Sequence, residues 1–159
     1  MSRPLDIDVS ALERFVVQAK AATYVGGGSP APTQRAGEHL LTYGDGPWSY
    51  QDSYVGGADF CGQETVRYHD VPVWSMIYSA HLIRPEVLDG ATAGRVIKQA
   101  LTAMYAEGRF LGGWTADVDA WRYADTSTGD VTRFTGLETI ERDGERLYEL
   151  RYLGGTVRE

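Results

Sequence analysis

The sequence predicts an α+β fold in which two helices pack on one face of a curved antiparallel sheet of about seven strands. Two segments carry apolar residues at helical spacing, near residues 10–22 and 91–107. Short alternating segments bounded by turn residues fill residues 40–82 and 120–153. Glycine makes up 19 of 159 residues, which favours many tight turns over long helices. The predicted order is one helix, four strands, one helix and three strands.

The first helix is expected to start at Ser10, because Ser10 and Glu13 have the spacing of a capping box. Residues 1–9 would then form a flexible arm. The pattern becomes strand-like at residues 23–25. Residues 26–37 are rich in Gly and Pro and predict a loop, either a simple connector or a lid.

Four strands of an antiparallel meander are expected between the two helices. Their predicted ranges are residues 40–43, 48–55, 60–68 and 73–82. A strong turn signal, Gly44-Asp45-Gly46-Pro47, separates the first two strands, and a weaker one at residues 69–72 separates the last two.

The second helix is expected over residues 91–107, with Gly108 as its stop. Three strands are predicted after it, at residues 120–124, 131–141 and 145–153. Asp143-Gly144 has the composition of a tight hairpin between the last two. A helix followed by strands thus occurs twice, although no internal repeat is obvious.

Size and charge exclude several classes of protein. A chain of 159 residues predicts one domain, residues 1–159. The 15 Lys and Arg are outnumbered by 22 Asp and Glu and form no cluster, which argues against nucleic acid as a partner. No apolar run approaches the roughly 20 residues of a membrane span, and no secretory leader follows Met1. One cysteine, Cys61, excludes an internal disulfide framework, so a cytoplasmic location is expected, with Cys61 as a small buried residue.

The established catalytic signatures are missing from the sequence. It contains no GxSxG elbow, no GxxxxGK[ST] phosphate loop, no GxGxxG fingerprint and no HExxH pair. Its three histidines, His39, His69 and His81, lie far apart. No metal and no cofactor are therefore expected.

One face of the strand at residues 48–55 carries the most informative pattern. Strand alternation places Trp48, Tyr50, Asp52 and Tyr54 on the same side. Asp52 either reaches water at the sheet edge or lies among the rings, where burial raises its pKa. In the first case Asp52 is structural, and in the second it is a pocket acid or a ligand anchor.

Glu64 is a second carboxylate in an otherwise apolar row, which it shares with Phe60, Val66 and Tyr68. If the strands bring Asp52 and Glu64 together, charge repulsion raises one apparent pKa and makes an acid/base pair. Otherwise each carboxylate accepts a hydrogen bond from a Tyr, Trp or Arg and stabilises the fold.

A third row, Trp74, Met76, Tyr78, Ala80 and Leu82, is more typical of a core than of a cofactor site. Its rings nevertheless lie on the strand next to Glu64 in the predicted meander.

Several motifs, spread over most of the chain, resemble one known family. They are Phe15 with Ala19-Lys20 and Thr23-Tyr24; residues 48–54 with Gly56-Gly57; residues 60–64; residues 72–76; residues 134–136 with Glu138; and Tyr148 with residues 152–155. In this order and spacing they resemble an uncharacterised prokaryotic family, domain of unknown function 5680. The resemblance implies a bacterial source and a sensory or ligand-binding role, because that domain often follows an Xre-type helix-turn-helix. The chain resembles the free-standing form of the family, without the DNA-binding segment.

Two positions depart from the family pattern. Ile77 stands where the family has an Asn, and Leu153 stands where it has a His. If those polar groups serve a shared activity, the resemblance implies that this member has lost or altered it.

The leading hypothesis is a small-molecule-binding domain with an aromatic, carboxylate-containing pocket on the concave face of the sheet. The residues expected to line it are Tyr24, Tyr50, Asp52, Tyr54, Glu64, Trp74 and Tyr78. The carboxylates would orient a hydroxyl or a cationic nitrogen of a small organic ligand, and the rings would stack on it or make cation–π contacts.

Two alternatives remain open. The first is a cofactor-independent enzyme of the cyclase, isomerase or hydrolase kind, with Asp52, Glu64 and Tyr50 as candidate acid/base residues. The second is a structural protein that forms a homodimer or larger oligomer through an exposed strand edge, which needs no pocket.

Overall fold

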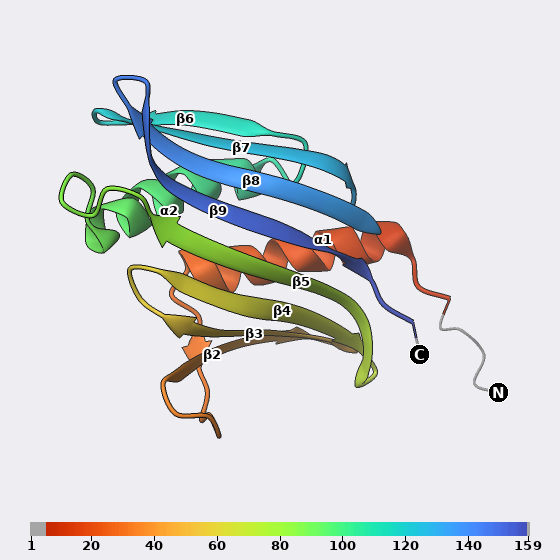
Figure 1. The fold of residues 1–159 in the computed structure, drawn as a ribbon. Coiled ribbons are helices and arrows are strands. Elements are labelled where there is room, and N and C mark those ends of the chain that lie inside the picture. The colour runs from red at the N-terminus through yellow and green to blue at the C-terminus, as the bar shows by residue number, and fades with distance from the viewer. Residues whose placement is uncertain (1–5, 159) are drawn as a thin grey trace.

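A single curved, open antiparallel sheet dominates residues 6–158, the part of the chain that the computed structural model describes (Figure 1). The strand order is β1-β2-β3-β4-β5-β9-β8-β7-β6. Strand β1, Ser29–Pro30, has only two residues, so eight strands form the body of the sheet, one more than predicted. The predicted α+β class is confirmed, with both α-helices on one face of the sheet (Figure 1).

The chain is built as two halves, each a helix followed by a four-stranded meander. The first half contains α1 (Val9–Lys20), β2 (Glu38–Asp45), β3 (Trp48–Gly56), β4 (Phe60–Tyr68) and β5 (Val71–Leu82). The second half contains α2 (Gly90–Ala106), β6 (Trp114–Val118), β7 (Trp121–Asp130), β8 (Arg133–Arg142) and β9 (Glu145–Thr156). The last strands of the halves, β5 and β9, pair antiparallel at the centre of the sheet.

The prediction missed β6, which pairs with β7 at the far edge of the sheet. Its five residues follow Gly112-Gly113, which has the appearance of a loop. The real β7 is also longer than the predicted strand at residues 120–124, because strand pairing with β8 extends it to Asp130. The tight hairpin at Asp143-Gly144 is confirmed by positive φ angles of 54° and 78°.

The predicted start of the first helix was wrong by one residue. Asp8, not Ser10, is the N-cap, and its carboxylate accepts a hydrogen bond of 2.9 Å from the Ser10 amide. The helix therefore begins at Val9, while residues 1–5 of the predicted arm lie outside the described residues. The second helix begins at Gly90 after the cap Asp89, close to the prediction.

Residues 23–25 are not strand-like, contrary to the prediction. They belong to η1, a π-helical segment over Ala21–Val25 that continues α1. The β-branched Thr23 is accommodated because its hydroxyl donates to the Ala19 carbonyl at 2.8 Å. The wider turn shifts the register of the helix end and places Tyr24 on the side of the cavity described below.

The core lies between the two helices and the concave face of the sheet. Leu12 and Val16 of α1, Val96 of α2 and Trp74 of β5 are all fully buried there. Burying one such side chain contributes about 1.5–3 kcal/mol, so the helices are held mainly by this layer. None of the helices in residues 6–158 is both long and apolar enough to cross a membrane.

Candidate functional site

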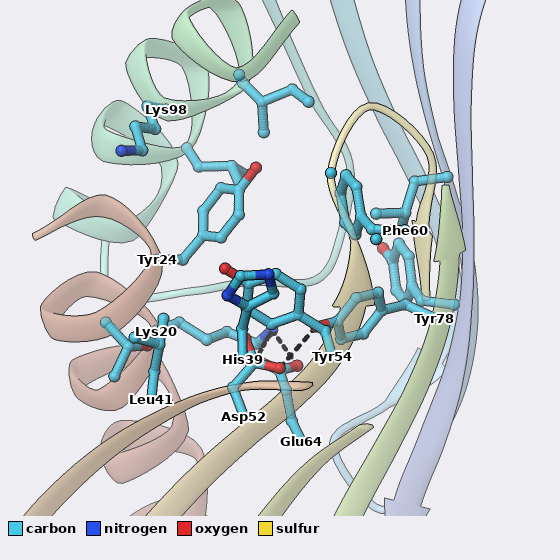
Figure 2. Close-up of a pocket in the computed structure, with 18 of the residues that line it drawn as sticks. Lys20, Tyr24, His39, Leu41, Asp52, Tyr54, Phe60, Glu64, Tyr78 and Lys98 are labelled. Carbon is cyan, nitrogen blue, oxygen red and sulfur yellow. Dashed lines mark hydrogen bonds and ion pairs between the residues drawn. The ribbon is translucent and has the colours of Figure 1, made fainter. Parts of the chain in front are cut away.

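The apolar layer is interrupted by a cavity of about 900 Å³ between the helices and the concave face of the sheet. Figure 2 shows Lys20 and Tyr24 on the helix side, facing Asp52, Glu64 and Tyr78 from the strands. Residues 30–33 and 56–58, at strand ends and in the loops next to them, also line the space, so the Gly/Pro-rich segment borders the cavity. These residues are mostly exposed and mark its opening to solvent.

Strand register brings the two predicted carboxylates together. Asp52 of β3 lies directly opposite Glu64 of β4 in the antiparallel ladder, so both side chains point to the concave face. Each residue is only 4% exposed. The sequence left open whether the strands place Asp52 beside Glu64, and the strand register shows that they do.

Glu64 is bound by a buried ammonium group. Lys20, in the last turn of α1, places its Nζ 2.8 Å from Oε2 and 3.0 Å from Oε1 of Glu64. The Tyr50 hydroxyl also donates to Oε1. Because Lys20 and Glu64 are both nearly inaccessible, this is a charge pair in a low-dielectric site.

Asp52 accepts a hydrogen bond of 2.6 Å from the hydroxyl of Tyr78, a residue of β5. The Tyr78 side chain reaches β3 by crossing β4 at Gly62, where an added Cβ would lie 2.6 Å from the phenol oxygen. Burial, and then repulsion by Glu64, raise the pKa of Asp52 to about 7. Asp52 can therefore gain or lose a proton near neutral pH.

The second half of the chain supplies a matching pair of carboxylates. Asp125 of β7 lies opposite Glu138 of β8, and Tyr152 of β9 donates to Asp125 at 2.7 Å. Tyr152 crosses β8 at Gly136, just as Tyr78 crosses β4. Burial raises the pKa of Asp125 to about 6. Burial, and then repulsion by Asp125, raise the pKa of Glu138 to about 8.

Aromatic rings form much of the remaining wall. The aromatic residues that line the cavity are Tyr24, Tyr54, Phe60, Tyr78, Tyr105, Phe110, Tyr148 and Tyr152. Lys20 Nζ lies 5.4 Å from the centre of the Phe110 ring, in cation–π range. The cavity thus combines flat apolar surfaces with a few fixed polar groups, which is the composition of small-molecule sites.

Five of the seven residues expected to line the pocket do so. These are Tyr24, Asp52, Tyr54, Glu64 and Tyr78. Tyr50 and Trp74 do not line the cavity but lie behind its wall. Trp74 is fully buried, and its Nε1 donates to the Val131 carbonyl at 3.0 Å.

Sequence reasoning missed Lys20, Asp125 and Glu138, although a signal for the two acids was present. The motif Trp-x-Tyr-x-Asp occurs at residues 48–52 and again at 121–125. The motif Phe-x-Gly-x-Glu-Thr occurs at residues 60–65 and again at 134–139. The chain therefore contains an internal repeat, and the repeat identifies Asp125 and Glu138 as counterparts of Asp52 and Glu64.

Cys61 is exposed, so its predicted burial was wrong. Alternation along β4 turns Cys61 to the outer face of the sheet, whereas Glu64 points to the concave face. Within residues 6–158 no three His, Cys, Asp or Glu side chains are grouped closely enough to hold a metal ion.

Ile77 and Leu153, which depart from the expected family pattern, also lie on the outer face. They are cross-strand partners on β5 and β9 and are 50% and 52% exposed. Neither residue lines the cavity. The identity of these two residues therefore affects the outer surface and not the carboxylate site.

The fold and site together define an α+β protein with two helices over the concave face of an open antiparallel sheet. The chain belongs to the family described as domain of unknown function DUF5680, whose model matches residues 52–157. The match includes Glu64, Asp125 and Glu138, and begins at Asp52. No curated protein and no solved structure gives a significant match.

Proposed function

We propose that this protein binds a small organic molecule in the cavity between its helices and the concave face of its sheet. The observation that carries the proposal is the hollow itself, which has a volume of about 900 Å³ and is lined by both rings and carboxylates. Ligand pockets typically measure about 300–1,000 Å³. Protein interiors otherwise pack at the density of organic crystals, and unfilled volume destabilises the native state.

The buried charges support the same proposal. Lys20, Glu64 and Asp52 are each at least nine-tenths buried, and Asp125 is 3% exposed. Replacing buried ion pairs by apolar residues of similar size is often neutral or stabilising, so such groups contribute little to stability. Their placement around one hollow is explained more simply by recognition of a polar ligand.

An acid–base enzyme in the same cavity is the second candidate, and Asp52 is the residue that favours it. A carboxyl with a pKa of about 7 can both accept and release protons at neutral pH. The phenol hydrogen-bonded to it is Tyr78, whereas the hydroxyl of Tyr50, the tyrosine named as a candidate acid/base residue, is bonded to Glu64.

A thermal-shift screen against a library of organic metabolites tests the binding proposal. At least one compound is expected to raise the melting temperature, and Asp52→Asn should reduce that shift. Asp45→Asn, the same change at an exposed strand end, should leave the shift intact. A screen without hits, together with mass spectra of denatured protein that show no co-purified compound, would reject the proposal.

The same variant separates a binder from an enzyme. If the bound compound is turned over, Asp52→Asn should reduce the turnover rate by about 10²-fold or more while the compound still binds. If it is not turned over, only affinity should change, and the acid–base alternative is rejected.

A further inference from the structure

The two halves of the chain correspond residue by residue around the cavity. Beyond the strand motifs, Gln18-Ala19 in α1 matches Gln99-Ala100 in α2 at the same distance from Tyr24 and Tyr105. Since β5 and β9 pair antiparallel at the centre, the halves are related by an approximate two-fold axis between these strands. Each half therefore contributes one Asp–Glu pair and one bridging tyrosine to the same hollow.

The correspondence fails at one position that faces the cavity. The residue that follows Gln18-Ala19 is Lys20, and the residue that follows Gln99-Ala100 is Leu101. Leu101 lines the cavity and is 4% exposed. The Asp52–Glu64 pair thus has the ammonium group of Lys20 beside it. At the equivalent position, the Asp125–Glu138 pair has the apolar side chain of Leu101.

The second pair has no ionic partner within the described residues. Lys20 lies within hydrogen-bond distance of both carboxylate oxygens of Glu64. Arg109, a nearby cation, donates to the carbonyls of Leu111 and Gly113. Neither of these cations, nor Lys98, which also lines the cavity, forms an ion pair with Asp125 or Glu138.

A separate observation points to a ligand at this end of the cavity. Tyr148 lines the same hollow and is 1% exposed, but its hydroxyl has no hydrogen-bond partner among residues 6–158. An unpaired buried hydroxyl costs about 1–3 kcal/mol. A polar group of a bound molecule would satisfy it.

We propose that the Asp125–Glu138 end of the cavity binds the protonated nitrogen of an organic amine, in the place that Lys20 Nζ occupies at the other end. The proposal rests on the ligand-binding function proposed above. The amine would form a charge-assisted hydrogen bond to Glu138, and its apolar part would lie against the tyrosine rings.

Proton release should accompany this binding. The titratable groups that face Glu138 are Lys20, Tyr24, Glu64, Tyr105, Asp125, Tyr123, Tyr148 and Tyr152. With a pKa of about 8, Glu138 is largely protonated at pH 6 and must lose its proton before it pairs with an ammonium group. Affinity should therefore rise roughly tenfold or more from pH 6 to pH 8.

Calorimetry with three probes of similar shape tests the proposal. The probes are phenethylammonium chloride, 2-phenylethanol and sodium 3-phenylpropanoate, which carry a cationic, a neutral and an anionic end on the same ring. At pH 8 the ammonium probe is expected to bind at least tenfold more tightly than the other two. Tighter binding of the neutral or anionic probe would overturn the amine proposal and leave the binding function standing.

Two variants locate the binding. Glu138→Gln keeps the shape of the side chain and should weaken the ammonium probe at least tenfold, whereas Glu145→Gln at an exposed site should not. Leu101→Lys should place an ammonium group where the amine is proposed to bind and abolish binding of the ammonium probe. Leu137→Lys on the outer face is the matched control and should leave that binding unchanged. Unchanged affinity in Glu138→Gln would overturn the proposal. If none of the three probes binds and the metabolite screen is also silent, both proposals fail.

Discussion

The ion pair between Lys20 and Glu64 is buried in the cavity wall, and the dependence of each member on the other can be measured residue by residue. Removing one member leaves the other as an uncompensated buried charge. We expect Lys20→Met to destabilise the protein by about 3–5 kcal/mol. The double variant Lys20→Met with Glu64→Gln should recover about 2 kcal/mol of that loss, because no bare charge remains.

Urea unfolding of the two single variants and the double variant measures this coupling. Additive losses would mean that Lys20 and Glu64 do not stabilise each other, contrary to their distance of 2.8 Å.

The three carboxyls with raised pKa values make stability depend on pH. Asp52, Asp125 and Glu138 have pKa values of about 7, 6 and 8 in the folded protein, against ordinary values of 3.8, 3.8 and 4.5. Between pH 4 and pH 8 the folded state therefore holds more protons than the unfolded state. The free energy of unfolding should fall as pH rises through this window.

Urea unfolding at pH 5 and pH 8 checks this sign. The free energy of unfolding should fall less between pH 5 and pH 8 in Glu138→Gln, by about 1 kcal/mol or more, because this variant lacks one of the carboxyls that titrate. A protein that is equally stable at both pH values, or more stable at pH 8, would contradict the burial of these acids.

At the scale of the strands, two glycines allow tyrosines to cross a neighbouring strand. Tyr152 lies over Gly136 so closely that an added Cβ would overlap its ring. We expect Gly136→Ala to cost about 1–3 kcal/mol, because Tyr152 must move and release Asp125. Gly94→Ala in α2, where the added Cβ would meet no other part of the protein within 4 Å, should instead stabilise by about 0.5–1 kcal/mol.

Thermal and urea unfolding of the two glycine variants provides the comparison. Equal effects at residues 136 and 94 would show that the crossing tyrosine does not need the glycine.

Most of the elements could be predicted from the sequence, because alternation and turn residues report local structure directly. The row Trp48, Tyr50, Asp52, Tyr54 shares a face as predicted, and Gly108 ends the second helix with a φ of +77°. Strand β6 was missed although it pairs with neighbouring β7, because the Asp119-Ala120 turn between them lacks the usual Asn-Gly or Asp-Gly signal. Segment η1 could not be predicted, because it packs against α2, which is distant in the sequence.

The site was partly predictable for the same reason. Period-two alternation identified Asp52 and Glu64, but register alone decides that they face each other. Lys20 was missed because a lysine in the last turn of a helix usually faces water, and only tertiary packing buries this one. Asp125 and Glu138 could have been found from the repeated motifs.

At the scale of the whole molecule, the two faces of the sheet have separate roles. The inner face holds the carboxylates, and the outer face carries the exposed pair Ile77 and Leu153. We expect the variant with both Ile77→Asn and Leu153→His to bind cavity ligands within about twofold of the original affinity, because neither side chain reaches the hollow.

Calorimetry with any compound found in the metabolite screen measures the affinity of the double variant and of the original protein. A large loss or gain of affinity would mean that the outer face contributes to the site.

The cavity as a ligand site is tested most directly by mapping where a bound compound acts. Backbone and aromatic NMR spectra, recorded with and without a compound that raises the melting temperature, report every perturbed residue. We expect the largest shifts at cavity residues from both halves, such as Tyr24, Glu64 and Glu138. Shifts confined to the outer face around Ile77 and Leu153, with the inner residues unchanged, would contradict the account.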